Sequence, residues 1–174
     1  MVDNELLNQY RDSVRRLLQS GAKEEVRSSV PEFQSIIFEE VLAFAKKEIV
    51  GVYDCAKVKL LTDKTREILK EKITSKIDLK FICLSHNGCH ADCDSLQIFK
   101  KLPPEMAFQD SRLTIIVVDG SITLAIGDCS GDPLLLYPGG LEGFTQQALK
   151  FVNELWAYAR NDSSNSIDVE GSHS

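Results

Sequence analysis

Five potential metal or redox ligands lie within eleven consecutive residues, in the run CLSHNGCHADC. They are Cys83, His86, Cys89, His90 and Cys93. The run contains most of the cysteine and histidine of the chain, which has five cysteines and three histidines in total. Thiolates and imidazoles are preferred zinc ligands, and clustered thiols can also respond to oxidation. Any metal or redox chemistry of this chain is therefore expected here first.

The spacing of these residues leaves three interpretations open. Four of them would share one face of a helix, because they fall at positions i, i+3, i+4 and i+7, and Cys83 would be a fifth candidate. Established zinc patterns, however, take ligand pairs from two separated segments. The segment is a zinc site, a set of redox-responsive thiols, or a surface loop after a strand in which Cys83 is a small buried hydrophobe.

Composition indicates one globular domain. The chain has 174 residues, of which 43% are hydrophobic and 26% charged, and these are average values for a folded protein. Its net charge of -6 argues against nucleic-acid binding by this domain alone. The sequence has neither a signal-peptide pattern nor an apolar run of about 20 residues. We therefore expect a cytoplasmic protein without membrane association, whose cysteines are free thiols or metal ligands rather than disulfides.

The first half of the chain alternates helix and strand patterns. Apolar residues at three- and four-residue steps predict an amphipathic helix with Asp3 as its N-cap and Gly21 as its end. This helix packs on its own domain or forms a dimer seam. The spacing of Ser29 and Glu32 is that of a capping box and predicts a second helix from Pro31 to Lys47. Further predicted elements are a strand at 48–53, a helix at 62–75 and a strand at 79–84.

The second half is predicted to be a hairpin followed by a helix. A weak helical pattern covers 95–101, and a strongly apolar run at 113–118 ends on Asp119-Gly120, a dipeptide that favours a two-residue turn into a returning strand at 122–126. A short strand follows at 134–137. The glycine-bearing segments GDCSGDP and YPGG lack the lysine of a phosphate-binding loop and are interpreted as turns. A closing helix is expected at 141–159.

This order of elements predicts an α/β sandwich around a mixed sheet. We expect three parts: an N-terminal amphipathic helical segment at 1–30, an α/β domain at 31–160, and a disordered acidic tail at 161–174.

The region from about Phe33 to Arg160 resembles the phospholipase D-like fold, and in particular the effector-binding domain of TrmB-type archaeal transcription regulators. The resemblance is carried by AFAKKEIVGVYD, by REILKEKI and DLKFICL, by SRLTIIVVDGSITLAIGD, and by the final FVNELWAYA. Active members have a His-x-Lys-x4-Asp motif followed by a Gly-Ser turn. Here Arg112, Thr114 and Asp119 occupy the matching positions of the motif, and Gly127-Asp128 stands near the turn. The resemblance thus implies the fold with a degenerate motif.

These substitutions argue against phosphodiesterase activity. The resemblance implies that the histidine of active members attacks phosphorus and that the lysine neutralises the phosphate oxygens. Arg112 is always protonated and is no nucleophile, and Thr114 carries no charge. Asp119 belongs to a hairpin turn, where an aspartate serves local hydrogen bonds. No catalytic residue is therefore assigned.

The function predicted from these observations is a catalytically inactive phospholipase D-like module that is regulatory or senses a ligand. It is expected to act through a small molecule, a protein partner or a homodimer. Two alternatives remain: a zinc-dependent hydrolase that uses the 83–93 cluster, and a structural adaptor subunit of a larger complex.

Overall fold

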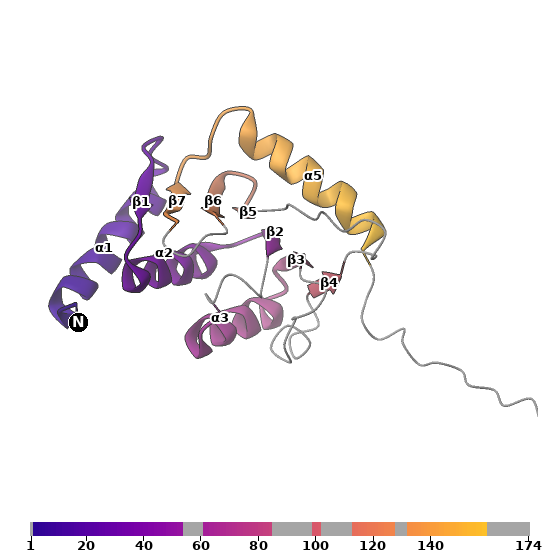
Figure 1. Ribbon diagram of the computed structural model, residues 1–174. Helices are drawn as coiled ribbons and strands as arrows, with labels where there is room; N and C mark the ends of the chain where they lie inside the picture. Colours follow the sequence, from indigo (N-terminus) through magenta and orange to yellow (C-terminus); the bar gives the residue numbers. More distant parts are fainter. Residues whose placement is uncertain (1, 54–60, 85–98, 102–112, 128–131, 160–174) are drawn as a thin grey trace, which may run out of the picture.

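The computed structural model describes residues 2–53, 61–84, 99–101, 113–127 and 132–159 (Figure 1). The predicted tail at 161–174 and most of the Cys/His run lie outside these residues. The helices are α1 (Asn4–Ser20), α2 (Pro31–Phe44), α3 (Asp63–Thr74) and α5 (Phe144–Tyr158). The strands are β1 (Val26–Ser28), β2 (Glu48–Tyr53), β3 (Asp78–Cys83), β4 (Phe99–Lys101), β5 (Leu113–Val118), β6 (Ile122–Gly127) and β7 (Leu134–Tyr137).

A single mixed sheet organises the fold, with the strand order β1-β7-β6-β5-β2-β3-β4. The β2–β3 and β3–β4 pairs are parallel, whereas β5 runs antiparallel to β2 and begins an antiparallel meander through β6 and β7. The β5–β6 turn is centred on Asp119 and Gly120, as predicted, but the connection has three residues rather than two, because Val118 pairs with Ile122. Asp119 and Gly120 have φ of 51° and 70°, and the amide of Ser121 donates to the carbonyl of Val118 at 3.1 Å. Positive φ at both central residues matches a type I′ turn.

Helices cover both faces of the sheet, so the predicted α/β sandwich is confirmed. Figure 1 shows α5 on one side of the sheet, with α2 and α3 on the other and α1 packed outside α2. Alternate residues of β2 divide between two cores. Ile49 and Tyr53 join the larger core on the α2 side, and Val50 and Val52 pack with Val152 of α5. Strict alternation on a central strand is what burial on both faces requires.

The first helix forms as expected and packs on its own domain. The Asp3 carboxylate accepts a hydrogen bond from the amide of Glu5, and Gly21 ends α1 in the left-handed conformation. Val14 and Leu18 are buried in the larger core. The structure thus shows this helix packed on its own domain, which is the first of the two interpretations given above.

Five charged residues join α1, α2 and α3 and are called the α1–α2 ion network here: Arg11, Arg15, Glu39, Glu40 and Lys64. The two glutamates are buried although they belong to α2. Arg11 reaches Glu40 at 2.6 Å and Glu39 at 2.8 Å, and Arg15 donates to both oxygens of Glu40 at 2.7 and 3.1 Å. Lys64 of α3 adds a contact to Glu39 at 3.0 Å. Buried carboxylates are tolerated here because each has a cationic partner.

Three details differ from the sequence predictions. The capping box of α2 is wrong: Val30 is the N-cap, no side chain caps the helix, and Ser28 rather than Ser29 accepts the amide of Val30. Phe99–Lys101 forms strand β4 instead of the end of a helix, because it pairs with β3 in parallel. Strand β1 was not predicted, since three residues show too little alternation to signal a strand.

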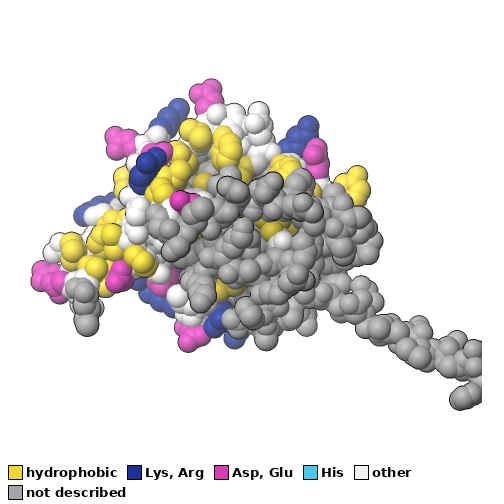
Figure 2. All heavy atoms as spheres, viewed as in Figure 1, with side chains coloured by type: hydrophobic (Ala, Val, Ile, Leu, Met, Phe, Trp, Pro, Cys, Tyr) yellow, Lys and Arg dark blue, Asp and Glu magenta, His cyan; other side chains and the backbone are white. Residues whose placement is uncertain are grey.

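None of the described helices has the length and apolarity needed to cross a bilayer. On the face seen in Figure 2, exposed hydrophobic side chains lie along α1 and α5 between charged ones.

Candidate functional site

The degenerate motif positions do not converge on one site. Thr114 is buried near the start of β5, where it pairs with Ile126, and Asp119 follows the last residue of the same strand. At about 3.4 Å per residue the two lie roughly 17 Å apart. Arg112 lies outside the described residues. Thr114 shares its end of the sheet with the carboxyl ends of β2 and β3, which is where ligands bind in many α/β folds.

Asp119 has a structural task that the sequence did not indicate. Its carboxylate accepts backbone hydrogen bonds from three consecutive residues, from Lys46 at 2.9 Å, Lys47 at 2.8 Å and Glu48 at 3.0 Å. Its own amide donates to the carbonyl of Glu48 at 3.0 Å. The expected local turn bonds are thus replaced by long-range ones. Asp119 fastens the β5–β6 turn to the connection between α2 and β2.

Cys83 is the predicted zinc ligand that lies within the described residues. Cys83 is buried at the end of β3 and is disulfide-bonded. The expectation of free thiols is therefore wrong for this residue, because the sequence does not show which sulfurs the fold brings within bonding distance. Within the described ranges no group of three metal-ligating side chains occurs. His86, Cys89, His90 and Cys93 lie outside those ranges, and zinc binding by them stays a prediction.

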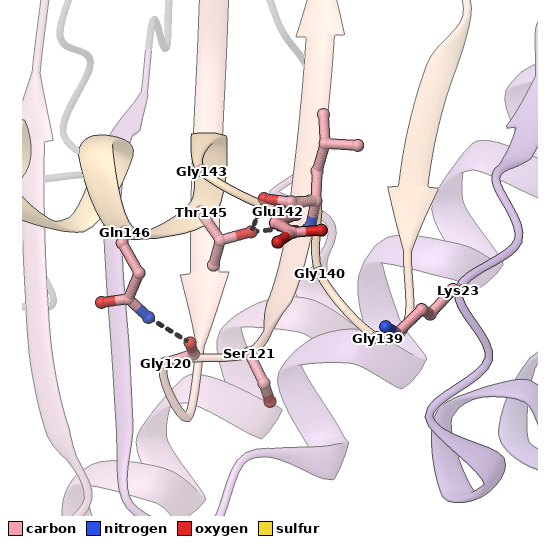
Figure 3. Close-up of a pocket in the computed structure, with 10 residues that line it drawn as sticks. Lys23, Gly120, Ser121, Gly139, Gly140, Glu142, Gly143, Thr145 and Gln146 are labelled. Atoms are coloured by element: carbon pink, nitrogen blue, oxygen red, sulfur yellow. Dashed lines mark hydrogen bonds between the residues drawn. The ribbon is translucent and has the colours of Figure 1, made fainter.

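A cavity of about 520 Å³ lies at the other end of the sheet from Thr114 (Figure 3). It opens between three connections: the one that follows α1, the β5–β6 turn and the β7–α5 loop. The lining residues are Lys23, Gly120, Ser121, Gly139, Gly140, Leu141, Glu142, Gly143, Thr145 and Gln146. This volume lies within the usual range for small-molecule sites.

Two adjacent glycines let the three connections come together. A Cβ on Gly139 would lie 2.5 Å from the carbonyl oxygen of Gly21, and a Cβ on Gly140 would lie 2.4 Å from that of Ser121. The amide of Gly139 also donates to the carbonyl of Ala22 at 2.8 Å. Only glycine permits such close backbone contact. Gly139 and Gly140 of the YPGG segment, interpreted above as a turn, therefore line the cavity.

Hydrogen bonds of threonine hydroxyls hold the beginning of α5 against β6 and the β7–α5 loop. The buried Thr145 hydroxyl lies 2.7 Å from that of Thr123 on β6, and it accepts from the amide of Leu141 at 2.8 Å. The Gln146 amide donates to the carbonyl of Gly120 at 3.3 Å, which ties α5 to the β5–β6 turn (Figure 3). These bonds preorganise the cavity, since they join the loop, the sheet and the helix that form its wall.

Replacing Gly139 with alanine is expected to lower the free energy of unfolding by about 2 kcal/mol, because backbone atoms must move to admit the new Cβ. The control is Gly21→Ala. Gly21 has φ of 60° but nothing within 4 Å of an added Cβ, so this variant should lose only about 1 kcal/mol, from backbone strain alone. Urea unfolding measures both losses. A smaller loss for Gly139→Ala than for Gly21→Ala would contradict the close-contact account.

Comparison with known proteins supports the fold and not an activity. No family model and no curated protein matches the chain. Nuc, a phospholipase D family member from Salmonella typhimurium, is similar over 79% of this chain and 95% of its own, with a TM-score of 0.57 and 11% identity. The chain has the phospholipase D-like fold. The predicted resemblance is thus confirmed at the level of the fold.

The second similar structure is TrmBL2, an archaeal chromatin protein, and its TM-score of 0.53 and 13% identity again indicate a shared fold. The match covers 90% of this chain and 64% of TrmBL2. That structure shows a novel mode of DNA binding by TrmBL2. The likeness to TrmB-type proteins that was expected from the sequence is thus also found in the structure.

Proposed function

We propose that this phospholipase D-like chain is a non-catalytic module that senses a small molecule in the cavity beside Gly139 and Gly140. The observation that carries the proposal is the construction of that cavity. Three connections meet through glycine contacts too close for any other residue, and buried hydroxyls hold its wall. Such preorganisation favours binding because the residues that line the cavity lose little conformational freedom when a ligand binds.

The sequence and the geometry of the degenerate motif support a non-catalytic role. Thr114, which is neutral and buried, stands at the lysine position of the motif. Asp119 stands at the aspartate position, and its carboxylate accepts hydrogen bonds from backbone amides. DNA binding is not carried over from TrmBL2, because the net charge of -6 opposes the contacts with phosphates that sustain such binding.

The proposal includes a response through a protein partner or a second copy of this chain. The cavity is suited to that role because Lys23 lies three residues after the end of α1 and three residues before the start of β1. A ligand that contacts this connection would influence how α1 and β1 sit on the domain. Light scattering of the protein with and without ligand measures whether its oligomeric state responds.

Thermal-shift measurement against sugars, nucleotides, carboxylates and amino acids tests the binding. We expect at least one class to raise the melting temperature in a saturable way. Gln146→Trp, which fills the cavity, should abolish the rise. Gln147→Trp adds the same bulk at the next, exposed position, which does not line the cavity, and it should retain the rise. A flat response across the panel, or equal loss in both variants, would count against the proposal.

A further inference from the structure

The cavity has one positive and one negative side chain, supplied by different connections. Lys23 belongs to the segment between α1 and β1, and Glu142 to the loop between β7 and α5. Within the described part of the chain neither side chain has an ion-pair or hydrogen-bond partner, although Arg27 and Tyr137 nearby are both engaged with Glu25. Figure 3 shows Lys23 on the connection that follows α1 and Glu142 on the loop that leads into α5.

From this arrangement we infer that the ligand is a zwitterion of the α-amino acid class, whose carboxylate meets Lys23 and whose ammonium meets Glu142. This inference rests on the proposed function, since it names the ligand of the same cavity. A purely anionic ligand would face repulsion from Glu142, and a purely cationic one would face repulsion from Lys23. A molecule with both charges forms two charge-assisted hydrogen bonds at once.

The remaining lining groups suit the rest of such a molecule. The Ser121 hydroxyl and the Gln146 amide offer neutral hydrogen bonds, and Leu141 offers apolar contact. A cavity of about 520 Å³ is large enough for an amino acid with a sizeable side chain, because sites of this size hold drug-sized molecules. The two charges would therefore recognise the backbone of the amino acid, and the neutral groups would select the side chain.

Calorimetric titration of the full chain with glycine, L-serine, L-glutamine and L-leucine tests the inference. For each one that binds, the matched amine without the carboxylate and the matched acid without the amine serve as comparisons. We expect saturable binding of at least one amino acid, and at least about tenfold weaker binding of its amine and of its acid. Equal binding of either comparison compound would overturn the zwitterion assignment.

Two charge-removing variants locate the contacts. Lys23→Met and Glu142→Gln should each weaken the binding of that amino acid by at least about tenfold. The controls Lys70→Met and Glu67→Gln, at exposed positions on α3 that do not line the cavity, should leave binding unchanged. Unchanged binding in Lys23→Met or Glu142→Gln would overturn the inference.

Results with the compound panel distinguish a failure of the zwitterion assignment from a failure of the proposed function. If a sugar, a nucleotide or a simple carboxylate binds in a way that Gln146→Trp abolishes, and no amino acid binds, the inference fails while the proposed function stands. If no compound of any class binds, both fail.

Discussion

Asp119→Ala is expected to lower the free energy of unfolding by about 3 to 4 kcal/mol. The variant loses three hydrogen bonds between the carboxylate and the amides of residues 46–48, each worth about 1 kcal/mol net. It also places alanine at φ of 51°, which adds about 1 kcal/mol of strain. Urea unfolding at neutral pH measures the loss.

Asp119→Asn separates the two contributions. Asparagine tolerates positive φ and keeps one side-chain oxygen that can accept hydrogen bonds, so about half of the loss should be recovered. Because the β5–β6 turn forms one wall of the cavity, Asp119→Ala should also weaken any ligand found there. Wild-type stability of Asp119→Ala would contradict the structural role assigned to this carboxylate.

Glu40→Ala is expected to lower the free energy of unfolding by about 3 kcal/mol. Its carboxylate is buried and binds Arg11 and Arg15, and removing one member of a buried ion pair leaves its partners without compensation. The partly exposed Arg15 can turn to water, which keeps the loss below that of a fully buried triad. Glu67→Ala, at an exposed position on α3, is the control and should change stability by less than about 0.5 kcal/mol.

The contribution of Glu40 should also depend on pH. Burial opposes its ionisation, but the hydrogen bonds from Arg15 and Arg11 outweigh burial and hold the pKa of Glu40 below its ordinary value of 4.5. A lowered pKa in the folded state means that the stabilisation is fully present above pH 4.5 and is lost as the pH falls through the folded pKa. The gap in urea midpoint between wild type and Glu40→Ala should therefore narrow between about pH 7 and about pH 3.5. A gap that widens on acidification would contradict the ion network.

The parts of this fold that could be predicted are those with strong local signals. The ends of α1 follow from a capping aspartate and a glycine in the left-handed conformation. The β5–β6 hairpin follows from the Asp119-Gly120 dipeptide between two apolar runs. In both cases the residues that decide the structure are neighbours in the chain, so the sequence alone contains the necessary information.

What could not be predicted depends on partners distant in the sequence. Glu39 and Glu40 are polar residues in a helix, and the helix pattern did not indicate that they are buried. Their burial depends on arginines at least 25 residues earlier in the chain. The hydrogen bonds that the Asp119 carboxylate accepts from the α2–β2 connection also join residues that are distant in the sequence. The two glycines after Tyr137 could have indicated close backbone contact, but their contacts are with Gly21 and Ser121. Such contacts appear only when the topology is known.

We propose that ligand binds beside Gly139 and Gly140 rather than at the end of the sheet that holds Thr114. Backbone amide shifts of the isotope-labelled protein test it most directly, during titration with the panel compound that raises the melting temperature most. The account predicts that the largest shift changes fall on residues 120–121 and 139–146, with little change at Thr114. The largest changes at Thr114 and at the carboxyl ends of β2 and β3 would contradict it.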